Sequence, residues 1–251
     1  MLTALQADPE LAPLRRSLDV YYGDAARDAA MDALYARFVQ PNELAFDIGS
    51  HVGDRISSFR RLGARVVALE PQALCVRALR ALYGDDPGVT VVEAACSDRP
   101  GRLTLRINSA NPTVSTASTD FIGAAGGAGG WQGQVWDREM EVTCTTLDGL
   151  IAQYGVPAFA KIDVEGFEDM VLAGLSQAVP ALSFEFTTIQ RDVAFRCLER
   201  LAVLGSYGFD IALGESQKLT FGRWVSGPEM AAHIAALPDA ANSGDVYGIE
   251  V

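Results

Sequence analysis

Three acidic residues close apolar segments of the sequence in positions that suit a nucleotide site. Asp47 lies near the end of "ELAFDIG" and is followed by Gly49 and Gly53. Glu70 ends "ARVVALE", 17 residues after Gly53, and Asp163 lies near the end of "AFAKIDVEG". Carboxylates accept hydrogen bonds from hydroxyl and ammonium groups, and glycines let the backbone approach a ligand closely. This combination indicates a turn that binds a nucleotide.

The glycine spacing distinguishes between two kinds of nucleotide. Dinucleotide sites carry G-x-G-x-x-G, whereas this chain has Asp47-x-Gly49-x-x-x-Gly53. Negative charge on Asp47 opposes a pyrophosphate and suits a cofactor with a cationic end, and Glu70 can accept two hydrogen bonds from a ribose diol. S-adenosylmethionine has a ribose, an ammonium and a sulfonium, and no phosphate. The alternative for this segment is a tight strand-to-helix turn that needs glycine only for clearance.

The segments around these residues alternate between strand and helix patterns. Strands are expected at 43–49, 64–70, 88–95, 102–107, 139–147, 158–166, 181–186, 209–214, 217–222 and 244–251, and helices at 53–63, 71–84, 147–155, 167–175, 189–205 and 228–236. Such alternation predicts an α/β fold with a mostly parallel sheet and helices on both faces. Ligands of such sheets bind beyond the carboxyl ends of the strands, where Asp47, Glu70 and Asp163 are expected.

Two segments stand apart from the alternation. Residues 1–40 are predicted to form a helical extension, with Ala26, Ala30, Leu34 and Phe38 on one helix face, and residues 41–251 a single domain. The segment at about 107–138 has six glycines between 123 and 133 and is predicted to be a long mobile loop. Two tryptophans in it, Trp131 and Trp136, either stack on a substrate as a lid or pack on aromatic residues of the loop itself.

Composition excludes several classes of function. The chain has 251 residues, of which 49% are hydrophobic, and a net charge of −12, which repels nucleic acid and anionic lipid. The four cysteines stand singly, so we expect neither a zinc site nor a disulfide framework, and no metal ion. No apolar run is long enough to span a membrane, and no signal peptide is evident, so a cytoplasmic location is expected.

The motifs resemble those of a known family. "AFDIGSHVGD" with "VVALEPQ" is similar to the cofactor-binding half of class I S-adenosylmethionine-dependent methyltransferases, and "TTLDGL", "AFAKIDVEGFEDMVLAGL" and "LSFEF" resemble the FkbM type, over about residues 44–186. The resemblance implies a Rossmann-like sheet of seven strands whose last strand is antiparallel. It also implies methyl transfer, usually to a hydroxyl of a sugar or natural product.

The resemblance also implies roles for individual residues. Asp47, Gly49 and Gly53 would line the methionine part of the cofactor, Glu70 would hold the ribose, and Ala95 and Cys96 would lie near the adenine. Ser50, His51, Pro71 and Asp163 complete the expected cofactor-binding set. Family members usually carry alanine and asparagine where this chain has Ser50 and His51, so those two positions depart from the pattern.

Two residues are candidates for catalysis. Asp163 is expected to position the acceptor hydroxyl or take its proton, and His51, whose usual pKa lies near neutrality, is the alternative base. The other interpretation of His51 is a helix-start residue that bonds to backbone or cofactor. Lys161 and Glu185, in apolar strands, are interpreted either as functional or as parts of a buried ion-pair network.

These features predict an O-methyltransferase that uses S-adenosylmethionine and acts on a hydroxyl of a small molecule. Two other classes stay open at this point: an oxidoreductase that uses NAD, and a non-catalytic cofactor-binding partner protein. The sequence does not indicate which molecule is the acceptor.

Overall fold

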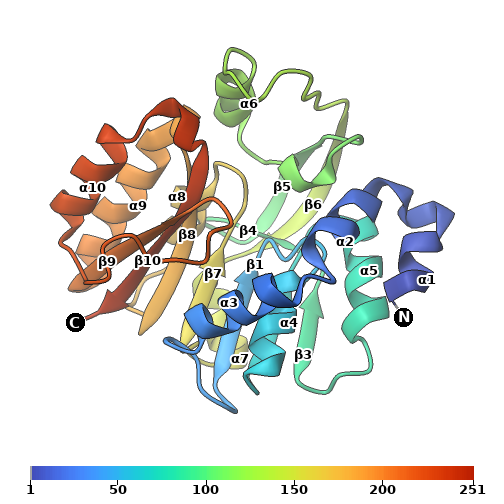
Figure 1. Ribbon diagram of the computed structural model, residues 1–251, viewed down its shortest axis with the longest axis horizontal. Helices are drawn as coiled ribbons and strands as arrows, with labels where there is room; N and C mark the ends of the chain where they lie inside the picture. Colours follow the sequence, from blue (N-terminus) through green and yellow to red (C-terminus); the bar gives the residue numbers. More distant parts are fainter. Residues whose placement is uncertain (1) are drawn as a thin grey trace.

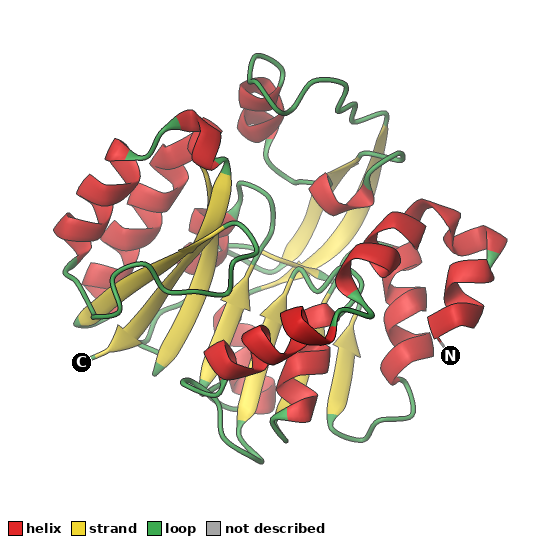
Figure 2. Cartoon of the chain, in the orientation of Figure 1, coloured by secondary structure: helices red, strands yellow, loops and turns green. Residues whose placement is uncertain are grey.

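A seven-stranded sheet runs through the centre of the computed structural model, which describes residues 2–251 (Figures 1 and 2). Its strand order is β3-β2-β1-β7-β8-β10-β9. The strands are β1 (Leu44–Ile48), β2 (Arg65–Leu69), β3 (Val89–Val92), β7 (Phe159–Ile162), β8 (Ala181–Thr187), β9 (Tyr207–Leu213) and β10 (Ser243–Glu250). β10 runs antiparallel to both of its neighbours, β8 and β9. The predicted mostly parallel sheet with an antiparallel last strand is therefore confirmed.

Helices cover both faces of this sheet, as the alternation predicts. One face packs against α7 (Leu147–Tyr154), α8 (Glu168–Ala173), α9 (Arg191–Leu204) and α10 (Gly227–Ala236). The other packs against α3 (Ala25–Tyr35), α4 (Asp54–Arg61) and part of α5 (Ala73–Tyr83). All five residues of β1 are buried, because a central parallel strand covered on both sides meets no water.

The N-terminal segment is helical and packs against α5. It consists of α1 (Leu2–Ala7), the 3-10 helix η1 (Pro9–Leu14) and α2 (Arg15–Tyr21), whose apolar side chains contact Cys75 and Ala78. The expected buried face of α3 is wrong in part, because Ala26 is exposed and Met31, Leu34 and Tyr35 are buried. The aromatic side chains of α4 and β7, against which Tyr35 packs, fix this face.

A second, three-stranded sheet lies beside the main one and has the order β4-β6-β5. It is made of β4 (Ala95–Cys96), β5 (Gly101–Ile107) and β6 (Arg138–Thr145). The segment between β5 and β6 contains the 3-10 helix η2 (Pro112–Val114) and α6 (Thr119–Ala125). Trp131 and Trp136 both pack edge-on against Phe121, so the two tryptophans contact an aromatic residue of their own segment.

One expected strand is absent, and another ends earlier than predicted. Residues 217–222 form no strand, because the backbone N–H groups of Phe221 and Gly222 donate to the carboxylate of Asp210 instead of to a neighbouring strand. The strand expected at 158–166 ends at Ile162, and Glu165 has a left-handed backbone with φ 58°. The remaining 3-10 helices are η3 (Thr188–Gln190) and η4 (Asp239–Ala241). Within residues 2–251, no helix has the length and apolarity to cross a membrane.

Candidate cofactor and acceptor site

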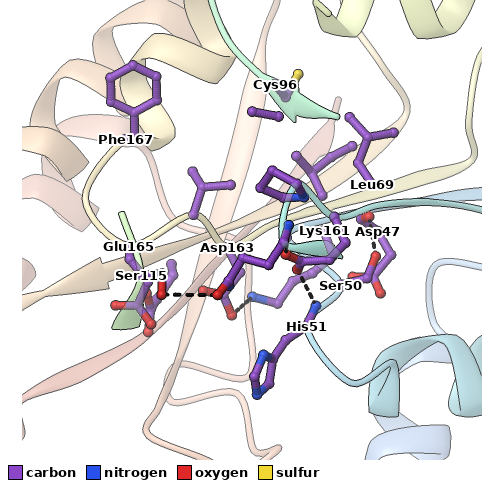
Figure 3. Close-up of a pocket in the computed structure, with 18 of the residues that line it drawn as sticks. Asp47, Ser50, His51, Leu69, Cys96, Ser115, Lys161, Asp163, Glu165 and Phe167 are labelled. Carbon is purple, nitrogen blue, oxygen red and sulfur yellow. Dashed lines mark hydrogen bonds and ion pairs between the residues drawn. The ribbon is translucent and has the colours of Figure 1, made fainter. Parts of the chain in front are cut away.

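A pocket opens at the carboxyl ends of β1, β2 and β7, which are neighbours in the main sheet (Figure 3). Most of the residues predicted to form the site line it: Asp47, Gly49, Ser50, His51, Glu70, Pro71, Ala95, Cys96 and Asp163. Gly53 does not, because its Cα faces Leu79 and Tyr83 of α5. The topology thus brings together residues that are more than one hundred positions apart in the sequence.

The turn after β1 is held in a shape that requires glycine. Gly49 has φ 85°, and a Cβ placed there would lie 1.8 Å from the carbonyl oxygen of Asp163. The backbone N–H groups of Gly49 and Ser50 both donate to the carbonyl of Leu69 at 2.9 Å. The Ser50 hydroxyl donates to the carbonyl of Asp47 at 2.8 Å. The hydrogen bonds to Leu69 in β2 and the close approach to Asp163 after β7 therefore fix the position of this turn.

Asp47 is a buried carboxyl group with an unpartnered oxygen. Its side chain is 2% exposed, and Oδ2 has no hydrogen-bond partner. Burial, together with the nearby Asp54, raises its pKa to about 7. A buried acceptor without a donor is costly, and an ammonium group of a ligand would satisfy it. This oxygen fits the cationic methionine end of S-adenosylmethionine.

Glu70 supports the loops on either side of it. Its two carboxylate oxygens accept the backbone N–H groups of His51 at 2.9 Å and Gln72 at 2.8 Å. Burial raises its pKa to about 7, against the lowering effect of these two hydrogen bonds. Each carboxylate oxygen has a second lone pair, so the group retains the capacity to accept from a ribose diol. Gln72 is the N-cap of α5, which begins at Ala73, and Pro71 precedes the cap.

An apolar wall faces these acids across the pocket. It combines Leu69 and Ala94 with Cys96, and adds Leu103 and Leu105 from β5 of the second sheet. Cys96 is 3% exposed, and Figure 3 shows it and Leu69 among the residues that line the pocket. Small and branched apolar side chains of this kind suit a flat aromatic base such as adenine. Leu103 and Leu105 were not predicted, because nothing in their sequence segment distinguishes them from sheet core.

The side chain of His51 contacts two segments that lie outside the main sheet. Its Nε2 lies 2.8 Å from the hydroxyl of Ser17 in α2 and 3.2 Å from that of Thr113 in η2, and its Nδ1 lies 3.5 Å from Cys75 Sγ. Burial lowers its pKa to about 4, so the ring is neutral at neutral pH. With both ring nitrogens engaged by side chains, His51 joins the N-terminal helices to the motif turn.

A buried lysine, Lys161 of β7, forms two ion pairs on the β7 side of the pocket. The ammonium of Lys161 lies 2.9 Å from Asp163 Oδ2 and 2.8 Å from Asp245 Oδ1. Burial opposes ionisation of Asp163, but Lys161 holds the pKa of this carboxyl below its usual value. The two acids likewise hold the pKa of Lys161 well above its usual value, despite its burial. The ion-pair interpretation of Lys161 is thus confirmed, and Asp245 on β10 is a partner that the sequence did not indicate.

Three carboxyl groups converge beside this ion pair. Oxygens of Asp163, Glu165 and Glu185 all lie within 4.8 Å of one another. Burial, and then the charge of Asp163, raises the pKa of both glutamates well above the usual value. Lys161 and the neighbouring Asp163 and Glu165 appear together in Figure 3. Because β7 ends at Ile162, Glu165 reaches the cluster through its left-handed turn and not through strand alternation.

One protein family matches the sequence over most of its length. A model of the methyltransferase FkbM domain matches residues 47–211. That range contains the glycine turn, Glu70, the second sheet, the Lys161–Asp163 segment and Glu185. No curated protein matches the chain in sequence.

Solved structures with a similar fold include methyltransferases of several kinds. A precorrin-6y C5,15-methyltransferase from Geobacter metallireducens is 12% identical, with 89% of this chain and 87% of that chain covered and a TM-score of 0.45. An rRNA methylase from Streptococcus thermophilus is 9% identical, with coverages of 88% and 93% and a TM-score of 0.43. A TehB-like S-adenosylmethionine-dependent methyltransferase from Corynebacterium glutamicum is 9% identical, with coverages of 94% and 94% and a TM-score of 0.46. Likenesses at this level carry no conclusion about the acceptor.

Proposed function

Because the chain belongs to the FkbM methyltransferase family and uses S-adenosylmethionine as its methyl donor, we propose that it methylates a hydroxyl oxygen of a small molecule. The observation that carries this proposal is the convergence of Asp163, Glu165 and Glu185 in the same pocket as the glycine turn. Carboxyl groups hydrogen-bond to hydroxyls, and a cluster of three suits an acceptor with several of them.

The charge of the pocket supports a small neutral acceptor over nucleic acid. Two cationic side chains line it, Arg55 and Lys161, and both are paired with acids. The acidic side chains that line it are Asp47, Asp54, Glu70, Asp163, Glu165, Glu185 and Glu215. A phosphate backbone entering this pocket would meet net negative charge in a poorly screened site. The net charge of −12 for the whole chain points the same way.

The cofactor would be held by residues on the β1 and β2 side. We assign the ammonium to Asp47, the ribose to Glu70, and the adenine to Ala95 and the apolar wall that contains Cys96. Gly49, Ser50 and Pro71 shape the backbone around it. When bound, S-adenosylmethionine supplies a methyl group on a sulfonium sulfur, which is activated toward displacement.

Asp163 is the residue that we assign to the acceptor hydroxyl. In the transfer, a bond forms between the hydroxyl oxygen and the methyl carbon while the carbon–sulfur bond breaks, and its electron pair stays on sulfur. The oxygen becomes strongly acidic as it is alkylated, so even a carboxylate of low pKa can take its proton. Lys161 keeps Asp163 ionised and oriented for this task. His51 does not fit the role of base, because its ring nitrogens face Ser17, Thr113 and Cys75.

Incubation with S-adenosylmethionine carrying an isotopic label on the methyl group tests this proposal. The panel comprises monosaccharides, glycosides and phenols, with RNA and primary amines as the competing acceptor classes. We expect label in an ether linkage of a hydroxylated small molecule and none in RNA. Label that appears only in RNA or only on nitrogen would refute the acceptor class while leaving methyl transfer intact.

An absence of transfer to every acceptor, with cofactor bound, would favour the non-catalytic alternative. The NAD-dependent alternative has lost its support, since the G-x-G-x-x-G pattern is missing and an unpartnered buried carboxyl, Asp47, occupies the turn where a pyrophosphate would lie. Titration with NAD as a control should show no saturable binding.

A further inference from the structure

The carboxyl cluster of Asp163, Glu165 and Glu185 holds more acid than its protein partners neutralise. Among the described residues, Lys161 is the one basic side chain that pairs with this cluster. The same lysine also pairs with Asp245. No ion pair within residues 2–251 involves the carboxyl of Glu165 or Glu185. Buried carboxyl groups without a counter-charge are unfavourable as anions.

Each of the three acids in this cluster has a carboxyl oxygen outside any ion pair. Glu185 Oε2 is buried and has no hydrogen-bond partner. The side chain of Glu165 is nine-tenths buried, with 9% exposed, and it faces the same pocket. Asp163 directs Oδ2 to Lys161, and its carboxylate also lies within hydrogen-bonding reach of the Glu185 carboxyl when that group carries a proton. Each of the three residues can thus offer one oxygen without breaking an ion pair.

The spacing of the oxygens allows a divalent ion to be bound directly by all three carboxyl groups. The three ligand atoms lie within 4.8 Å of one another. Oxygens on opposite sides of a Ca²⁺ ion are about 4.6–5.2 Å apart, and around Mg²⁺ about 4.0–4.2 Å, given their usual bond lengths. Carboxylate oxygens are the ligands that hard divalent ions such as Mg²⁺, Mn²⁺ and Ca²⁺ prefer. Three ligands on one side of an open pocket leave further positions for water and for an acceptor.

We propose that Asp163, Glu165 and Glu185 form a binding site for a divalent cation on the acceptor side of the pocket. This revises the expectation of a metal-free protein, which rested on the cysteine pattern and on zinc. Binding of the cation does not depend on the identity of the acceptor. Its consequence for catalysis rests on the proposed function: a hydroxyl bound to the cation would lose its proton more readily and be oriented for methylation.

The alternative state of the cluster is one in which protons take the place of the cation. Carboxyl groups that lie this close together without a counter-charge are favourable only when they share protons or bind a cation. A divalent ion would displace those protons. The two states differ in one measurable respect, since only the cation site gives saturable metal binding with release of protons.

Calorimetric titration of the full chain with MgCl₂, MnCl₂ and CaCl₂, without cofactor or acceptor, tests the proposal. We expect saturable binding of one ion per chain for at least one metal. Repetition in two buffers of different ionisation enthalpy should reveal the released protons. Glu185→Gln keeps the shape of the side chain and removes its charge, and it should weaken binding at least tenfold.

Glu215→Gln is the matched control, because Glu215 lines the same pocket but lies outside the cluster. It should bind the metal as the wild type does. Melting curves without metal show whether each variant is folded. No saturable binding by the folded wild type, or equal binding by folded Glu185→Gln, would overturn the proposal. Metal binding in a protein that methylates no hydroxyl would instead uphold the site and refute the proposed acceptor.

Discussion

The two sides of the pocket are built differently. On the β1 and β2 side, Asp47, Gly49 and Glu70 come from two consecutive strand–turn units, and the backbone groups of the turns are satisfied by hydrogen bonds. On the β7 and β8 side, Asp163, Glu165 and Glu185 also come from consecutive units, but Asp245 joins them from β10. The charges of these acids exceed those of their partners. The first arrangement is a turn fixed by backbone hydrogen bonds that presents one unpartnered carboxyl oxygen, on Asp47. The second is a cluster of acids with a single lysine as its basic partner, and such a cluster can act on a substrate.

Asp163→Asn gives the largest expected effect on turnover. Loss of an acid–base group typically lowers kcat by about 10²–10⁴-fold, and we expect a fall of at least about 10²-fold here. Single-turnover assays measure it, with labelled cofactor and an acceptor that becomes labelled in the panel described above. Asp192→Asn on the exposed surface of α9 is a matched control that should retain the wild-type rate. Full turnover by folded Asp163→Asn would remove this residue from the chemistry.

Glu70→Ala acts on the other side of the pocket. Hydrogen bonds to a charged group contribute about 1.5–3 kcal/mol each, so loss of a ribose contact should weaken cofactor binding by roughly 10- to 100-fold. Glu70→Gln should cost less, because its amide oxygen still accepts one bond. The bonds from His51 and Gln72 predict lower melting temperatures as well. If Glu70 only supported these loops, the folded fraction of Glu70→Ala would bind the cofactor with unchanged Kd.

Cofactor affinity should depend on pH through Asp47. Its pKa of about 7 means that the group is protonated below pH 7 and ionised above it, and only the ionised form attracts an ammonium. Binding should therefore weaken as pH falls from 8 to 6, by at most about tenfold per pH unit for one proton. Asp47→Asn should lower the slope of log Kd against pH by about one proton. The slope that remains is assigned to Glu70, whose pKa is also about 7. An unchanged slope in this variant would place the titrating group elsewhere.

The same pKa shift has a consequence for stability. The folded pKa of Asp47 lies above its unfolded value, so its contribution favours the folded state below the unfolded pKa and is lost as pH rises to about 7. In the absence of cofactor, Asp47→Asn should gain stability relative to wild type as pH rises from 5 to 8. Melting curves across that range measure the difference.

His51→Asn should have the smallest effect on turnover. His51 has a left-handed backbone with φ 46°, which asparagine tolerates better than most residues. We expect kcat to change by less than about threefold, that is, by less than 1 kcal/mol in the barrier. The lost contacts to Ser17 and Thr113 should lower the melting temperature. A fall in kcat as large as that of Asp163→Asn would identify His51 as the base.

The sequence predicted the first side of the pocket better than the second. The positions of Asp47, Gly49 and Glu70 follow from the length of one strand–helix–strand unit, so local patterns suffice. Gly53 was predicted by the same motif, yet it serves the packing of α5. The pairing of Lys161 with Asp245 depends on where β10 enters the sheet, which no local pattern fixes.

The residues that surround His51 were missed for the same reason. Ser17 and Thr113 are ordinary polar residues in a helix and a loop, and only the packing of α2 and η2 brings them to the ring. The fold class could be predicted because alternating strand and helix patterns admit few sheet topologies. The strand expected at 217–222 failed because a side-chain carboxylate competes for its backbone N–H groups.

Cofactor affinity of Asp163→Asn tests the separation of the two sides most directly. Titration calorimetry with S-adenosylmethionine compares the wild type, Asp163→Asn and Glu70→Ala, each shown to be folded by melting curves. If the cofactor is held by the β1 and β2 side, Asp163→Asn should bind within about threefold of the wild-type Kd, a difference below 1 kcal/mol. Glu70→Ala should bind at least about tenfold more weakly. Equal weakening of binding by the two substitutions would contradict a pocket with separate cofactor and acceptor sides.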